Sequence, residues 1–215
     1  MIKACIFDLD GVVVDTAKYH FLAWRQIAVN LGFDFTVQQN ERLKGVSRMQ
    51  SLDILLEIGN IKATQAEKEK LAVTKNGLYL AYIEKMTPAE ILPGVLRFLD
   101  ELQKGGILIA LGSASKNAMI ILEKINLAAK FDAVIDGNKV AKAKPDPEVF
   151  LKGATELCVE PSSCVVFEDA QAGIDAARNG RMHVIGIGQP ENLINADYVI
   201  PGFEKFNLKQ LRSWY

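Results

Sequence analysis

Five short apolar runs constrain the fold of this chain more than any other feature of its sequence. Unbroken apolar runs of this length are typical of parallel strands that are covered by helices on both faces. From about residue 92 onward the runs alternate with helical patterns, at Val95–Gln103, Asn117–Ile125, Glu148–Leu157 and Ala170–Asn179. This alternation predicts an α/β fold, a doubly wound Rossmann-like core with a parallel sheet. The predicted strands are Ala4–Phe7, Ile107–Leu111, Ala133–Ile135, Cys164–Phe167 and Val184–Ile187.

A long insertion separates the first predicted strand from the second. Residues 16–88 carry only helical patterns, and their starts are marked by Ser47 and by a capping box of Thr64 with Glu67. We therefore predict two domains, an α/β core formed by 1–15 and 89–215 and a helical cap formed by 16–88. Two linkers join them, which suits a hinge that opens and closes over a site.

Composition and charge exclude several classes of function. The 215 residues include 25 basic and 26 acidic side chains, and the net charge of −1 gives no reason to expect binding to nucleic acid or to a membrane. No apolar stretch approaches the roughly 20 residues that span a bilayer, and Asp8 interrupts the N-terminal run, so we expect no signal peptide. The odd number of cysteines, three, favours reduced thiols and a cytoplasmic location. The absence of repeats makes a monomer the default expectation.

Two aspartates follow the first predicted strand directly. Asp8 and Asp10 are two residues apart in an extended segment, so both can face one site. In doubly wound sheets, ligands bind beyond the carboxyl ends of the strands. Two carboxylates there repel each other unless a cation or a shared proton stabilises them. One of them could then act as a nucleophile while the other transfers protons.

Polar groups also follow the other predicted strands. Ser113–Asn117 is a loop of small residues that enters a helix and suits an anion, Lys144 precedes Pro145, and Glu168 and Asp169 end the fourth strand. Each has an ordinary alternative: a turn, a helix N-cap, a solvated lysine or a complement to a helix dipole. Together they predict a Mg²⁺ site for phosphoryl transfer, because hard oxygen ligands would lie beside groups that bind phosphate.

These motifs resemble those of the haloacid dehalogenase superfamily. The resemblance covers essentially the whole chain, and the helical cap stands where the superfamily places its type 1 caps. Within the superfamily, the chain resembles the mutases that interconvert β-D-glucose 1-phosphate and glucose 6-phosphate. The segments that carry this resemblance are Asp8–Val12, Val14–Ala17 with His20 and Trp24, Leu43–Arg48, Lys75-Asn76, Ser113–Asn117, Lys144-Pro145 and Glu168–Ile174.

The resemblance implies a role for each matching residue. Asp8 would be the nucleophile that becomes phosphorylated, and Asp10 the general acid and base. Mg²⁺ would be held by Asp8, the backbone carbonyl of Asp10, Glu168 and Asp169. The transferring phosphoryl group would be held by Ser113, Ala114 and Lys144. Lys116 and Asn117 would bind the distal phosphate or the sugar, and Arg48, from the cap, would hold the non-transferring phosphate through two hydrogen bonds. The residues that would shape or gate the sugar pocket are Thr16, His20, Trp24, Lys44, Gly45, Val46, Ser51 and Lys75.

Three functions remain open at this point. The first is the mutase, which would work through an aspartyl-phosphate and β-glucose 1,6-bisphosphate. The second is a sugar-phosphate phosphatase, which would keep every core residue and differ only in the cap. The third is a non-enzymatic signalling module that carries a phosphorylated aspartate, although such a module needs no helical cap. The individual cap residues also have ordinary alternatives, since Trp24 suits a core and Lys44 or Arg48 suits a solvated surface.

Overall fold

Six parallel strands form the sheet of the computed structural model, which describes residues 1–215. The strand order is β3-β2-β1-β4-β5-β6, so β1 lies in the interior of the sheet. The first four predicted strands lie within one residue of observed strands, and β5 begins one residue earlier than predicted. The edge strand β6 was not predicted. The strands are β1 (Ala4–Phe7), β2 (Leu108–Gly112), β3 (Ala133–Ile135), β4 (Cys164–Glu168), β5 (His183–Ile187) and β6 (Tyr198–Ile200).

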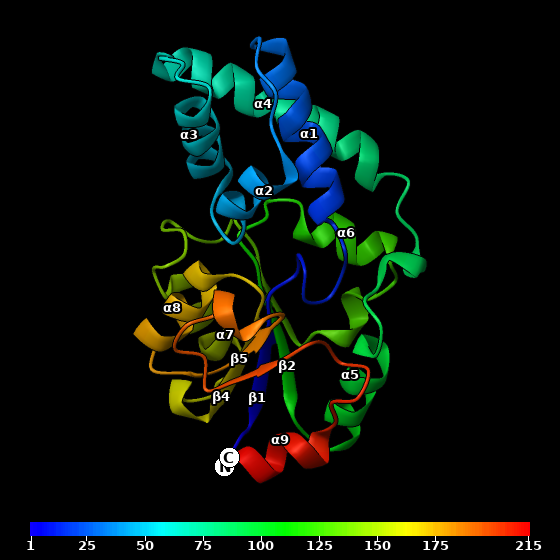
Figure 1. The fold of residues 1–215 in the computed structure, drawn as a ribbon. Coiled ribbons are helices and arrows are strands. Elements are labelled where there is room, and N and C mark those ends of the chain that lie inside the picture. The colour runs from blue at the N-terminus through cyan, green and yellow to red at the C-terminus, as the bar shows by residue number, and fades with distance from the viewer.

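Helices cover both faces of the sheet, as Figure 1 shows. Successive side chains of a strand point to opposite faces, so Cys5 and Phe7 of β1 enter one apolar core while Ala4 and Ile6 enter another. The doubly wound α/β fold is therefore confirmed. The first core is shared with helices α5 (Val95–Lys104), α6 (Ala118–Lys124) and α9 (Leu208–Trp214), and the second with α7 (Glu148–Glu156) and α8 (Gln171–Asn179).

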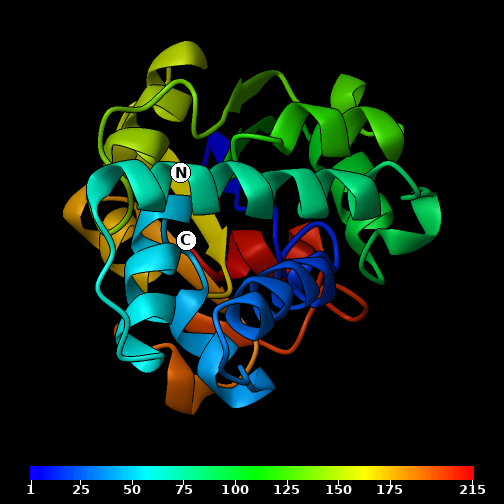
Figure 2. The ribbon, with the colours of Figure 1, turned by 90° about the horizontal axis from the view of Figure 1, so that it is seen from above.

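The remaining four helices form a separate group above the carboxyl edge of the sheet (Figures 1 and 2). They pack around their own apolar cluster, which includes Trp24, Phe35, Leu52 and Leu55. The capping box of Thr64 and Glu67 is present, and Ser47 caps α3 as expected. These cap helices are α1 (Ala17–Asn30), α2 (Val37–Asn40), α3 (Arg48–Ile58) and α4 (Gln65–Ile83). Short 3-10 turns occur at Glu41–Leu43, Pro88–Glu90, Ala128–Lys130, Pro161–Ser163 and Pro190–Asn192.

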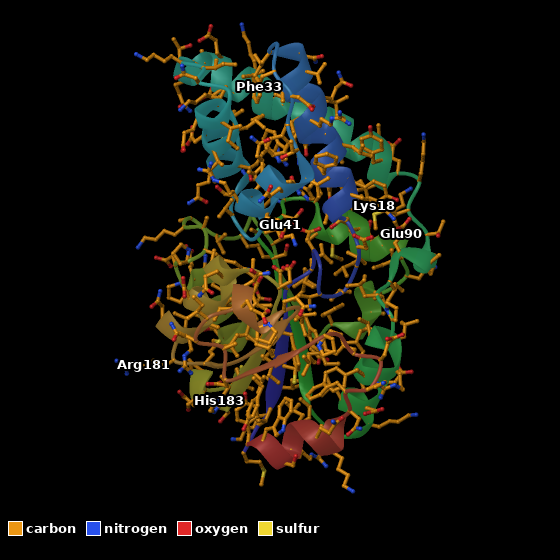
Figure 3. The ribbon with its side chains drawn as sticks, in the orientation of Figure 1. Lys18, Phe33, Glu41, Glu90, Arg181 and His183 are labelled. Carbon is orange, nitrogen blue, oxygen red and sulfur yellow. The ribbon has the colours of Figure 1, made fainter.

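The two linkers between the cap helices and the sheet lie side by side. The backbone N–H of Asp15 donates to the Glu90 carbonyl at 3.1 Å, and that of Leu92 donates to the Val13 carbonyl at 3.0 Å. Figure 3 shows Lys18 and Glu90 at this junction, where the Lys18 ammonium lies 2.6 Å from the Glu90 carboxylate. The cap and the core therefore meet at a short paired segment, which is where a hinge between them would act.

The connections between the strands place the carboxyl end of β1 at the point where the strand order reverses. The chain passes from β1 to β2 and β3 on one side and then crosses to β4 on the other side. Ligands of open α/β sheets bind at this kind of switch point. No helix has the length and apolar character that crossing a membrane requires.

Candidate active site

Asp8 and Asp10 lie at the switch point, beneath the cap helices. The backbone N–H of Asp8 donates to the Phe167 carbonyl at 2.9 Å, which extends the pairing of β1 with β4 by one step. The chain then turns at Gly11, whose φ is 84°. A Cβ atom on Gly11 would overlap the Asp169 carboxylate, so only glycine allows this turn to approach that group.

Lys144 provides the positive charge beside Asp8. Its Nζ lies 2.5 Å from Oδ1 of Asp8 and 2.8 Å from Oε2 of Glu168, and all three side chains are buried. Burial alone would lower the pKa of Lys144, but the two neighbouring carboxylates outweigh it and raise that pKa. Lys144 is therefore a permanent cation next to the proposed nucleophile.

Three carboxylates form a cluster with room for a cation. One oxygen each of Asp8, Glu168 and Asp169 lies within 4.8 Å of the others. Burial and the charge of Asp8 raise the pKa of Glu168 to about 7, although Lys144 opposes them, and burial with the charge of Glu168 raises the pKa of Asp169. One lysine cannot balance three carboxylates, and an all-oxygen donor set is what Mg²⁺ prefers. The donor set fits that ion.

The loop after β2 has fewer free N–H groups than the sequence suggested. The N–H of Ser113 donates to the Ile135 carbonyl, and those of Ser115 and Asn117 donate to the hydroxyls of Ser113 and Ser115. The N–H groups of Ala114 and Lys116 remain available for an anion. The loop's own hydroxyls thus fix its shape, and the number of backbone donors for a phosphate is smaller than a bare small-residue loop implies.

Asp10 is surrounded by groups from the start of the cap. The Thr16 hydroxyl donates to its Oδ1, and Nε2 of His20 lies 3.9 Å from the same oxygen. Burial and the charge of Asp8 raise the pKa of Asp10 to about 6, against the opposing effect of the Thr16 hydroxyl. A carboxyl with a pKa near 6 exchanges protons readily around neutral pH, as a general acid and base must.

The buried Lys75 and the half-buried His20 form a pair in the cap. Nζ of Lys75 lies 2.9 Å from Nδ1 of His20 and 4.9 and 4.6 Å from the ring centres of Trp24 and Tyr79. Burial and the charge of Arg48 lower the pKa of Lys75 to about 7, and burial and Lys75 lower the pKa of His20 well below its usual value. His20 is thus neutral, and when Lys75 donates to Nδ1 the ring proton sits on Nε2, toward Asp10.

A loop of the cap reaches down to the core. Figure 3 shows Glu41 on the side of the cap that faces the core, and its carboxylate lies 2.8 Å from Nζ of Lys44. Gly45 follows with a φ of 71°, and a Cβ atom there would come within 2.7 Å of the Ala170 methyl group. The cap therefore rests on the start of α8 at a position that leaves no room for a side chain.

Cap and core together enclose one large cavity of about 540 Å³. That volume is in the range of pockets that bind small molecules. Three predicted residues, Thr16, Ser113 and Glu168, are buried and are not among the residues that line it, although Thr16 and Glu168 contact the lining residues Asp10 and Lys144. The other predicted site residues line it: Asp8, Asp10, His20, Trp24, Lys44, Gly45, Val46, Arg48, Ser51, Lys75, Ala114, Lys116, Asn117, Lys144 and Asp169.

Several residues of the cavity and its surroundings were not predicted. Asn40 lines the cavity, is buried, and has an Oδ1 atom without a hydrogen-bond partner. The segment Val140–Ala143 forms part of the wall, and Asn76 contacts two lining residues. Asn76 belongs to the Lys75-Asn76 segment that carries the family resemblance, but none of these positions was given a role in the site, because each reaches the cavity through tertiary packing. Trp24 proves to be both a core residue of the cap and part of the cavity wall.

Comparison with known proteins places the chain in a family. A family model described as haloacid dehalogenase-like hydrolase matches residues 2–181. The chain belongs to the haloacid dehalogenase-like hydrolase family. This confirms the resemblance that the motifs at the strand ends indicate.

Relatives within the family include a mutase and a phosphatase. The chain is 45% identical over 213 residues to β-phosphoglucomutase of Bacillus subtilis, and the aligned region covers 98% of this chain and 94% of the relative. It is 32% identical over 180 residues to a phosphorylated carbohydrates phosphatase of Thermotoga maritima, covering 82% and 81% of the two chains. The crystal structure of β-phosphoglucomutase from Clostridium difficile matches with a TM-score of 0.96 and 43% identity, covering 100% of this chain and 97% of the other.

Proposed function

We propose that this protein is a Mg²⁺-dependent β-phosphoglucomutase that interconverts β-D-glucose 1-phosphate and glucose 6-phosphate. The observation that carries the proposal is a single cavity with two sets of groups suited to phosphate. Asp8, Asp10 and Lys144 lie on its core side, while Arg48 and Asn117 meet where the cap approaches the core. A sugar bisphosphate needs two such places, and the similarity to the Bacillus subtilis mutase along nearly the whole chain supports the same activity.

The reaction begins with a phosphoryl group on Asp8. The C6 hydroxyl of β-glucose 1-phosphate attacks this phosphorus atom while Asp10 takes the hydroxyl proton, and the bond from phosphorus to Asp8 breaks. The product is β-glucose 1,6-bisphosphate, which turns over in the cavity. Asp8 then attacks the phosphorus at C1, and Asp10 returns its proton to the departing sugar oxygen. Glucose 6-phosphate is released and Asp8 is phosphorylated again.

The residues around Asp8 offset the charge of the phosphoryl group. Asp8, the carbonyl of Asp10, Glu168 and Asp169 would hold Mg²⁺, which when bound supplies positive charge to the phosphoryl oxygens. Lys144, whose Nζ lies against both Asp8 and Glu168, supplies a second positive charge beside Asp8. Ser113, through its hydroxyl, and Ala114, through its backbone N–H, would orient the same oxygens. Positioning and charge neutralisation of this kind account for most of the catalysis in phosphoryl transfer.

The cap would decide between transfer and hydrolysis. A phosphorylated Asp8 must survive until a sugar arrives, so Asp10 should activate a hydroxyl only when the cap has closed over the sugar. Thr16 and His20 both approach Asp10 from the cap side, and Lys75 orients His20. The remaining cap residues, Trp24, Lys44, Gly45, Val46 and Ser51, would shape the space for the sugar ring.

The proposed function also implies a partner, an oligomeric state and a cellular location. The partner is a small sugar phosphate, and we propose a monomer in the cytoplasm. Cys5 and Cys164 are buried free thiols, which supports a reducing compartment.

The decisive assay separates isomerisation from hydrolysis. Purified protein with Mg²⁺, β-glucose 1-phosphate and a trace of β-glucose 1,6-bisphosphate should form glucose 6-phosphate, and chelation of Mg²⁺ should stop the reaction. Asp8→Asn should remove all turnover, whereas Asp15→Asn, a change beside the hinge, should leave most of it. Release of inorganic phosphate without glucose 6-phosphate would instead identify a sugar-phosphate phosphatase.

A further inference from the structure

Asn76, a half-buried residue of α4, joins the cap to the core through one oxygen atom. Its Oδ1 accepts a hydrogen bond from Nη2 of Arg48 at 2.7 Å and another from Nδ2 of Asn117 at 3.0 Å. Arg48 begins α3, and Asn117 precedes α6 of the core. Two segments of the cap and one of the core therefore meet at a single acceptor beside the cavity.

The chemistry of the partners fixes the orientation of the Asn76 amide. Arginine has donors only, so the atom that faces Arg48 must be the oxygen, and Asn117 must then donate through its own NH₂ group. Two donors from different domains converge on one oxygen. A phosphate oxygen would require the same arrangement of donors.

The only hydrogen-bond partner of the Arg48 side chain is the neutral Asn76. Arg48 is half-buried, burial lowers its pKa, and it forms no ion pair with any carboxylate. The five N–H groups of a guanidinium leave several free after one bond to Asn76. The charge of Arg48 is thus held in place by Asn76 without being cancelled, and it remains available to an anion in the cavity.

We propose that Asn76 is a positioning residue for the phosphate that is not being transferred, an inference that rests on the proposed function. Its neutral carboxamide holds Arg48 and Asn117 together when the cap meets the core, and both then face the distal phosphate. An aspartate at this position has nearly the same shape but would pair with Arg48 and repel the phosphate. The proposal therefore depends on the neutrality of residue 76 and not only on its hydrogen bonds.

Asn76 is not needed to hold the cap helices together. The contact between α3 and α4 is formed by apolar residues of the cap cluster, including Leu52, Leu55 and Ala72. Substitution of Asn76 should therefore leave the cap folded. Thr74, on the same helix, is exposed and takes no part in this network, since its hydroxyl donates to the Lys70 carbonyl. Thr74→Asp thus adds the same charge to α4 and serves as the matched control.

The test is a binding measurement that does not depend on turnover. In the Mg²⁺-loaded Asp10→Asn protein, which keeps the proposed Mg²⁺ ligands but has lost the proposed general acid and so does not turn over, calorimetry gives the dissociation constant of β-glucose 1,6-bisphosphate, whose two phosphates must occupy both ends of the cavity. Adding Asn76→Asp should raise this constant at least about tenfold, in line with the loss of a charge-assisted phosphate contact. Adding Thr74→Asp should change it by no more than about twofold.

A second measurement separates positioning from general damage to the site. With Asp8 and Asp10 both intact, hydrolysis of acetyl phosphate uses only the transferring end of the cavity, so Asn76→Asp should keep this rate within about twofold of the unmodified protein. Equal dissociation constants for the Asn76→Asp and Thr74→Asp chains would overturn the proposal, as would a parallel loss of acetyl phosphate hydrolysis. Failure of the proposed function has a different signature, namely no glucose 6-phosphate from the unmodified protein.

Discussion

At the scale of single residues, the site depends on how buried charges are balanced. Lys144 contacts two of the three clustered carboxylates, and no other lysine or arginine forms an ion pair with them. A buried ion pair does not by itself stabilise a fold, because desolvation offsets most of the attraction. Its value here is functional, since it holds a cation beside Asp8, the residue that we propose attacks phosphorus.

Replacing Lys144 tests this assignment. Lys144→Met keeps the length of the side chain and removes its charge, so we expect kcat/KM for β-glucose 1-phosphate to fall by a factor of about 10² or more. Steady-state kinetics measure the change, and circular dichroism checks that the variant is folded. Lys124→Ala, which removes an exposed charge on α6, is the control and should have little effect. A fall of less than about threefold in Lys144→Met would show that this charge is not required.

At the scale of structural elements, the start of α7 is held by the carboxylate of Glu148. This group accepts from the N–H groups of Ala141 and Lys142 at 3.0 and 2.8 Å and lies 2.7 Å from Nζ of Lys152. Lys152 and these two N–H groups lower the pKa of Glu148 to about 2. Ala141 and Lys142 belong to the loop that leads to Lys144, so Glu148 ties that loop to the helix.

The lowered pKa of Glu148 gives stability a defined pH dependence. A carboxyl whose pKa is lower in the folded state contributes stability above its unfolded pKa and loses it as the pH falls toward the folded value. Glu148→Gln should therefore reduce the melting temperature at pH 7, and the difference from the unmodified protein should shrink between about pH 4.5 and pH 2. Thermal unfolding at several pH values measures it. Glu123→Gln, whose carboxylate makes no hydrogen bond or ion pair, should show no such convergence, and a pH-independent difference at Glu148 would contradict the account.

Replacing Gly45, in the cap loop that contacts the core, is a second test at this scale. Gly45→Ala would force a strained left-handed conformation and press a methyl group against Ala170, so the cap should close less completely. We expect kcat/KM to fall about tenfold with a small change in melting temperature. Gly77→Ala is the matched control, because a Cβ atom there meets nothing within 4 Å, and removing a helical glycine from α4 should stabilise the protein by about 0.5–1 kcal/mol. Undiminished activity in Gly45→Ala would show that this contact does not limit closure.

The elements that could be predicted from sequence are those whose own residues carry the signal. Ala4–Phe7 and Cys164–Phe167 are apolar throughout because both faces of the sheet are covered, and Thr64 with Glu67 marks a helix start in four residues. In contrast, β6 has only one buried residue, Ile200, and both β6 and α9 are stabilised by packing against distant parts of the chain. Asn76 lies in a segment that carries the family resemblance, but its contacts could not be predicted, because its partners are 28 and 41 residues away.

At the scale of the whole molecule, the sheet and the cap helices would serve two different parts of the reaction. The sheet presents the groups that we propose bind the transferring phosphoryl group. The cap helices, joined to it through the paired linkers, present the groups that would recognise the sugar and its second phosphate. The core alone cannot distinguish a mutase from a phosphatase, because both need the same charges around Asp8. The difference depends on whether the closed cap delivers a sugar hydroxyl and excludes water.

The most direct test of that claim is the ratio of phosphoryl transfer to hydrolysis, followed by phosphorus NMR. With β-glucose 1-phosphate, Mg²⁺ and a trace of the bisphosphate, we predict that nearly all of the phosphorus lost from the substrate appears as glucose 6-phosphate. The α anomer should react far more slowly, because its phosphate leaves from the other side of the ring. Inorganic phosphate as the main product, or equal rates for both anomers, would contradict the account.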